Sequence, residues 1–196
     1  LILLFRSEKR AADPVVNLGF FENRQLVLVL LIAGGTGIFQ ASFVFIPEMA
    51  VTAFKVNSSR ASFMLIPSVI AIAIGAPLWG RLIDKIGSRI VITAGLIFAS
   101  AGLFLVSRIN DETGMFYLAG ILYGFGLSAL VGSSLRYVAL NEVSASERAT
   151  SQGMITIFIS TGQILGSILI GVIATGGDKM DGFHHAFLFL TALTLI

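Results

Sequence analysis

The chain has 196 residues, of which 56% are hydrophobic and only 12% are charged, and its formal net charge is +2. Soluble domains carry roughly a quarter charged residues, so this composition indicates a membrane protein. The small net charge argues against a nucleic-acid partner, and a chain without cysteine has no disulfides or thiol chemistry.

The first 24 residues precede the first full hydrophobic run. The apolar stretch 1–5 is expected to end a preceding span, and residues 6–24 to form a cytoplasmic linker with a short interfacial segment. Apolar runs at both ends and the lack of a signal-peptide pattern predict a fragment of a longer, polytopic protein.

Six hydrophobic runs follow, and the first five are long enough to cross about 30 Å of hydrocarbon as helices. We therefore predict an all-α membrane protein with a transmembrane bundle over residues 25–196. The predicted spans are about 25–53, 61–79, 90–107, 115–140, 150–175 and 183–196, the last of them truncated.

The first span contains polar side chains that are unusual in an apolar helix. Gln40 lies near its middle, and Phe43 adds an aromatic surface close by. Glu48 has two interpretations. It is a functional carboxylate on the substrate path, because an ionisable group buried in the membrane is costly and usually serves a function, or it lies in water near the outer surface. Gln40, Phe43 and Glu48 are therefore candidates for contact with a cargo, and the same reasoning adds Tyr123 and Gln163 from later spans.

A polar hairpin, residues 80–89, joins the second and third spans. Gly80 and Gly87 permit a tight turn, and Asp84 is placed to cap the next helix. Three cations beside one membrane face predict a cytoplasmic location: Arg81, Lys85 and Arg89. With this loop inside, nine of the 13 Lys and Arg residues fall on the cytoplasmic side and four outside.

The fourth and fifth spans carry glycine ridges. Small residues at i+4 spacing let membrane helices approach closely, so these positions are predicted to pack against neighbours. They are Gly120, Gly124, Ser128 and Gly132 in one span and Gly162 and Gly166 in the next. Between the two spans, Ser144 and Glu147 form a capping-box pattern that opens a helix.

The hairpin G-R-L-x-D-K-x-G-x-R resembles the signature loop of the major facilitator superfamily, matching at Gly80, Leu82, Asp84, Lys85, Gly87 and Arg89 and departing at Ser88. Glu147 to Gly153, E-R-A-x-x-x-G, is similar to the loop after the tenth core helix of that superfamily. Residues 12–24, A-D-P-x-x-x-L-x-x-F-x-N-R, resemble the entry to the C-terminal half of its 14-span drug:proton antiporters.

This resemblance implies the C-terminal six-helix half of a secondary transporter in the inner or plasma membrane, whose two halves rock around a central site. The implied function is proton-coupled efflux of lipophilic or cationic drug-like compounds. The implied partners are a small-molecule substrate, protons, the lipid bilayer and the missing N-terminal half. The alternatives are a 12-span transporter of a sugar, organic acid or other metabolite, and a non-transporting scaffold or receptor-like module.

No enzyme is expected, since the sequence has neither a hydrolytic triad nor a G-x-x-x-x-G-K-[ST] phosphate loop. No cofactor or metal site is predicted, and His184-His185 is interpreted as an interfacial pair. Arg136 lies near the cytoplasmic end of the fourth span. It either pairs with Asp84 to hold a gate closed or extends to the headgroups while Asp84 only caps its helix.

Overall fold

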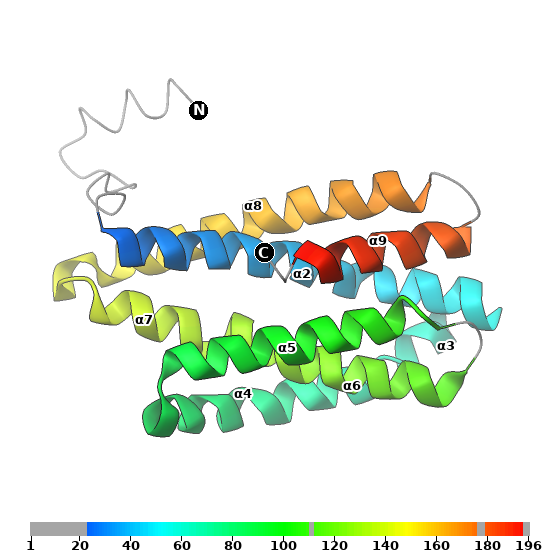
Figure 1. Cartoon of the computed structure of the whole chain (residues 1–196), viewed down its shortest axis with the longest axis horizontal. Helices are drawn as coiled ribbons and strands as arrows, with labels where there is room; N and C mark the ends of the chain where they lie inside the picture. Colours follow the sequence, from blue (N-terminus) through cyan, green and yellow to red (C-terminus); the bar gives the residue numbers. More distant parts are fainter. Residues whose placement is uncertain (1–22, 110–111, 176–178, 194–196) are drawn as a thin grey trace.

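The protein is an elongated bundle of helices that run along its length and connect at its two ends (Figure 1). This computed structural model describes residues 23–109, 112–175 and 179–193, except for the side chains of Gly132, Ser133 and Lys179. The predicted stretch 1–5 and nearly all of the linker 6–24 lie outside the described residues. The helices are α2 (Arg24–Phe54), α3 (Ser58–Phe63), α4 (Ile66–Ile86), α5 (Ser88–Val106), α6 (Thr113–Ala129), the π-helical η2 (Leu130–Ser134), α7 (Leu135–Asn141), the 3-10 turn η3 (Ala145–Glu147), α8 (Arg148–Ala174) and α9 (Lys179–Leu193).

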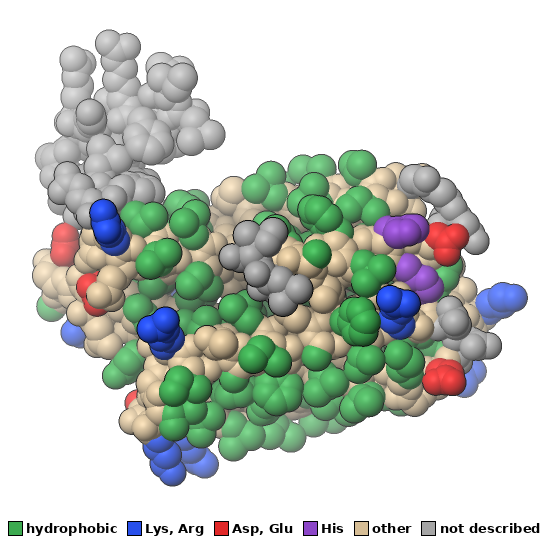
Figure 2. All heavy atoms as spheres, viewed as in Figure 1, with side chains coloured by type: hydrophobic (Ala, Val, Ile, Leu, Met, Phe, Trp, Pro, Cys, Tyr) green, Lys and Arg blue, Asp and Glu red, His purple; other side chains and the backbone are tan. Residues whose placement is uncertain are grey.

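The surface of the bundle suits a lipid environment. Figure 2 shows hydrophobic side chains over the middle of one face, with acidic and basic side chains gathered near the two ends. Large apolar side chains such as Leu31, Ile97, Ile164 and Val172 are more than 60% exposed. Within the described residues, four helices are long and apolar enough to cross a membrane: Arg24–Phe54, Ser58–Ile86, Ser88–Val106 and Ala145–Ala174. The chain is a multi-pass membrane protein.

The structure corrects the predicted hairpin 80–89. Helix α4 continues to Ile86, so Gly80 and Asp84 are helical, and only Gly87 breaks the helix before α5 begins at Ser88. The helix continues because Trp79 and Ile83, one turn apart, both pack in a buried cluster with residues of α5 and α6. Asp84 therefore lies exposed in the last turn of α4, and the N-cap of α5 is Gly87, with no side-chain cap.

Gly87 has φ 85° and ψ 156°, a conformation that is essentially restricted to glycine. Gly87→Ala is expected to lower the free energy of unfolding by about 1–3 kcal/mol, because the added Cβ strains this backbone. The thermal unfolding midpoint of the purified protein in detergent measures the effect. Gly35→Ala is the control, since its Cβ would meet nothing within 4 Å and its φ is not positive. Equal midpoints for the two variants would contradict the strained turn.

The fourth predicted span is one continuous path of three segments. Helix α6 passes into the π-helical turn η2 and then into α7, which ends at Asn141. π-Helical turns of this kind are rare and are frequent at functional sites. The predicted capping box is confirmed: Ser144 and Glu147 satisfy each other's backbone groups just before α8 begins.

Glycine allows the tightest helix pairs in the bundle. Helix α2 packs along α8, and α6 packs along both α4 and α5. At the α2–α8 crossing, a Cβ at Gly37 would lie 2.8 Å from the backbone nitrogen of Gln163, and one at Gly162 would lie 2.8 Å from the carbonyl carbon of Gly34. Real Cβ atoms do not approach backbone so closely, so these two helices are in direct backbone contact.

Candidate substrate groove

A half-open groove of about 280 Å³ lies where α2, α4, α6, η2 and α8 meet. Of its eight described lining residues, five are apolar, three are polar and none is charged. They are Gln40, Phe43 and Val44 from α2, Ile72 from α4, Leu127 and Ser128 from α6, Val131 from η2 and Gln163 from α8. Helices α5 and α9 contribute none of these residues. A mostly apolar hollow with a few convergent polar groups is the usual form of a small-molecule site.

The structure brings together three of the five residues that the sequence places on a substrate path: Gln40, Phe43 and Gln163. The two amides come from different helices and are both half-buried. They line the same groove because α2 and α8 cross in backbone contact at Gly37, one turn before Gln40 and directly against the Gln163 backbone. The resulting site offers hydrogen bonds without charge.

Tyr123, another predicted path residue, is not among the described residues that line the groove. Its side chain is fully buried, and its hydroxyl donates to the Phe39 carbonyl oxygen and lies 3.2 Å from the Ser42 hydroxyl. Its ring stacks on Phe43 at a centroid distance of 6.3 Å. A buried hydroxyl needs a partner, and α2 supplies one, so Tyr123 supports the groove from behind.

Tyr123→Phe is expected to lower the free energy of unfolding by about 0.5–1.5 kcal/mol, because a hydrogen bond between α6 and α2 is lost. Thermal unfolding in detergent, followed by circular dichroism, measures it. Tyr117→Phe on the same helix is the control, since the Tyr117 ring is only half-buried. A Tyr123→Phe protein as stable as the Tyr117→Phe protein would show that this bond contributes nothing.

Glu48 is the other predicted path residue that does not line the groove. It is exposed in the last two turns of α2, after Pro47, two helical turns beyond Gln40. An exposed carboxylate near a helix end can be solvated at little cost, and its role as a path residue stays a prediction.

The end of the bundle that holds the α4–α5 turn is rich in polar groups, and we refer to it as the signature-loop end. Arg81, Asp84, Lys85 and Arg89 are all exposed there. Arg136 donates from Nη1 to Gln152 Oε1 at 2.7 Å, and in the described part of the chain no ion pair joins it to Asp84.

Asn23 is a residue of the signature-loop end whose role sequence reasoning missed. It is the N-cap of α2, where its Oδ1 accepts from the Gln25 backbone at 2.9 Å, and its Nδ2 donates to Glu142 Oε2 at 3.3 Å. It thereby ties the start of α2 to the residue after α7. The signal was present, since an Asn before an apolar run is a typical helix start.

The predicted packing glycines lie at helix crossings. Gly120 and Gly124 face Ser68 of α4, while Gly162 and Gly166 face α2 at Gly34 and Ile38. The predicted packing contacts of Gly132 lie outside what the structure describes. Ser128, the fourth member of the predicted ridge, contacts Gly75 and also lines the groove, a second role that its spacing did not indicate.

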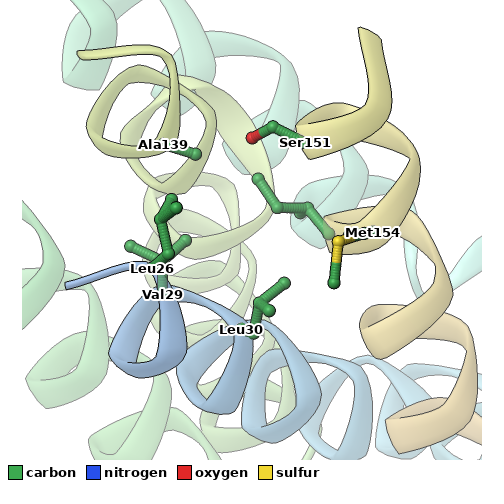
Figure 3. Close-up of a pocket in the computed structure, with 7 residues that line it drawn as sticks. Leu26, Val29, Leu30, Ala139, Ser151 and Met154 are labelled. Carbon is green, nitrogen blue, oxygen red and sulfur yellow. The ribbon is translucent and has the colours of Figure 1, made fainter. Parts of the chain in front are cut away.

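Three other hollows differ from the groove in chemistry. Figure 3 shows a cavity of about 10 Å³, surrounded by side chains of α2, α7 and α8, with room for about one water molecule at most. An open groove of about 530 Å³ lies between α2, α5 and α7 and contains none of the predicted path residues.

A hollow of about 380 Å³ at the opposite end of the bundle is lined by Arg108, Asp181, His184 and His185, among others. There His184 Nε2 lies 2.8 Å from the Ile109 carbonyl oxygen, and no three described His, Asp or Glu side chains are grouped to hold a metal ion.

Comparison with known proteins agrees with this arrangement. Residues 13–196 match the family model described as "Major Facilitator Superfamily". An uncharacterized MFS-type transporter of Bacillus subtilis, YfiU, is 29% identical over 177 residues, covering 89% of this chain and 34% of that protein. Multidrug resistance protein 3 of the same organism is 27% identical over 183 residues, again covering 89% and 34%.

A solved structure shares the fold. The nucleoside transporter NupG superposes with a TM-score of 0.79 at 18% sequence identity, covering 90% of this chain and 47% of that one. The present chain therefore has the fold of one half of such a protein. It spans about a third of the length of the curated relatives that it matches.

Proposed function

Since the chain belongs to the major facilitator superfamily, we propose that it forms the C-terminal half of a secondary transporter. The transporter exports lipophilic or cationic drug-like compounds across the inner or plasma membrane in exchange for protons. The N-terminal half of the same protein, the bilayer, the small-molecule cargo and protons are its partners. Residues 80–89 lie on the cytoplasmic side.

The observation that carries this proposal is the groove that contains Gln40 and Gln163. It draws on helices from across the bundle, and its apolar lining with three polar groups suits a lipophilic compound. In transporters built from two repeats, the substrate site lies between the repeats, and one half provides one wall of it. A drug as cargo is supported by the name of the relative called multidrug resistance protein 3.

Coupling to protons requires a group that gains and loses a proton during transport. None of the described residues that line the groove is acidic, and Glu48 lies elsewhere on α2. We therefore place the coupling carboxylates in the N-terminal half. If this half binds the cargo and the other half binds the protons, variants of Gln40 or Gln163 should change drug affinity and leave the pH dependence of transport unaltered.

Transport by the full-length protein in proteoliposomes tests the function. An imposed pH gradient is expected to drive movement of a fluorescent lipophilic cation such as ethidium, and an uncoupler is expected to abolish it. Gradient-independent movement of a sugar or organic acid would favour the metabolite transporter instead. A protein that moves neither kind of compound would favour the scaffold.

A further inference from the structure

We propose that the groove binds the uncharged, hydrogen-bonding part of the cargo. Gln40 and Gln163 together bind an amide-type ligand group that has both a donor and an acceptor, such as a carboxamide, a lactam or a urea. This inference rests on the proposed function, because it concerns the same groove, and it assigns the class of chemical group that this half of the transporter recognises.

The composition of the groove argues for an uncharged group. The described lining holds two carboxamides, one hydroxyl and five apolar side chains, with no acid or base among them. A cation that left water for this groove would meet no carboxylate to replace its hydration, and an anion would meet no basic group. A neutral polar group has a smaller desolvation cost, and the amides can repay it with hydrogen bonds.

The two carboxamides are free to make those bonds. Each has one acceptor oxygen and two N–H donors. In the described part of the chain no residue hydrogen-bonds either of these side chains. Ser128 differs, because its hydroxyl already donates to the Phe125 carbonyl oxygen at 2.7 Å. Only the lone pairs of Ser128 remain for a ligand. The amide pair is therefore the main source of directional recognition.

The groove is also held in place before any ligand binds. Gly37 packs against the Gln163 backbone and Gly166 against Ile38, so neither α2 nor α8 can shift without breaking a close contact. Phe43, beside Gln40, is supported by the stacked ring of Tyr123. Polar groups fixed by packing lose less freedom on binding, which raises both affinity and selectivity.

The chemistry of the ligand group follows from the pair. Two amides that each present a donor and an acceptor complement an amide-type group, which has the same two functions, and amides left buried without a partner would penalise a ligand that has neither function. A volume of about 280 Å³ accommodates part of a drug-sized molecule. The remainder of the cargo, including any charge, then extends toward the other half.

Binding of two probes to the full-length transporter in detergent tests the inference. Radiolabelled chloramphenicol carries a secondary amide, whereas tetraphenylphosphonium has no hydrogen-bonding group. Gln40→Leu and Gln163→Leu are each expected to raise the Kd for chloramphenicol about tenfold, as expected for the loss of one or two hydrogen bonds. The Kd for tetraphenylphosphonium should rise by less than about twofold, because this cation makes no hydrogen bond that either substitution could remove.

Gln25→Leu is the matched control, because Gln25 is exposed on α2 and lies outside this groove. It should leave both Kd values unchanged, and gel filtration should show all three variants folded. Equal losses for both probes, or no loss for chloramphenicol, would overturn the assignment of the amide pair. A wild-type protein that binds neither probe would instead overturn the proposed function, and the inference with it.

Discussion

Gly162→Ala is expected to be among the most destabilising single changes in this chain. The new Cβ would collide with the carbonyl oxygen of Gly34 and lie 2.8 Å from its carbon. Both atoms belong to the α2 backbone, which cannot move aside as a flexible side chain can. We expect the free energy of unfolding to fall by about 1–3 kcal/mol, the usual cost of overpacking, and the groove to widen as α2 and α8 separate.

The comparison with Gly171→Ala on the same helix isolates the effect. A Cβ at Gly171 would meet nothing within 4 Å, and alanine is the better helix former, so this variant should be neutral or slightly more stable. Thermal unfolding in detergent and drug affinity should both separate the two variants. If Gly162→Ala behaves like Gly171→Ala, then α2 and α8 are not in close contact in the membrane.

Asp84→Asn is expected to slow transport about tenfold or more without loss of folding. We propose that Asp84 pairs with Arg136 in the conformation that is closed to the cytoplasm, whereas in the present structure Arg136 donates to Gln152. A partly desolvated pair worth about 1.4 kcal/mol shifts a two-state equilibrium tenfold. Initial rates of drug transport in proteoliposomes measure the effect.

Asp181→Asn is the matched control, because Asp181 is an exposed acid at the opposite end of the bundle. It should transport at the wild-type rate. Exchanging the charges, with Asp84→Arg and Arg136→Asp in one protein, should restore part of the rate that either change alone removes. Wild-type transport by Asp84→Asn, or no rescue by the exchange, would contradict the pairing of these two residues.

Features that depend on local pattern could be predicted from the sequence. A run of apolar residues between polar segments marks a membrane helix, and the Ser144–Glu147 capping box depends only on residues three apart. The glycine spacing indicated close helix crossings, because a helix face without bulky side chains lets another membrane helix approach its backbone. The groove amides Gln40 and Gln163 stood out as polar groups in apolar spans.

Features that depend on tertiary packing could not be predicted. The polar residues after Trp79 suggested a loop, but Ile83 is buried and keeps α4 helical to Ile86. Tyr123 looked like a cargo contact, and only the position of the Phe39 carbonyl shows that its hydroxyl already has a partner. Residues that line the groove from α4 and η2, such as Ile72 and Val131, are ordinary apolar residues with no mark in the sequence.

Protection of a cysteine at position 163 tests most directly whether this groove is the cargo site. The chain has no cysteine of its own, so Gln163→Cys places a single thiol here once any cysteines in the other half are replaced. A transported drug at saturating concentration is expected to slow labelling of this thiol by a water-soluble maleimide at least about fivefold, because bound cargo covers the groove. Thr93→Cys, in the separate groove between α2, α5 and α7, should label at the same rate with or without drug. If a transported drug does not slow labelling at position 163, this groove is not the cargo site.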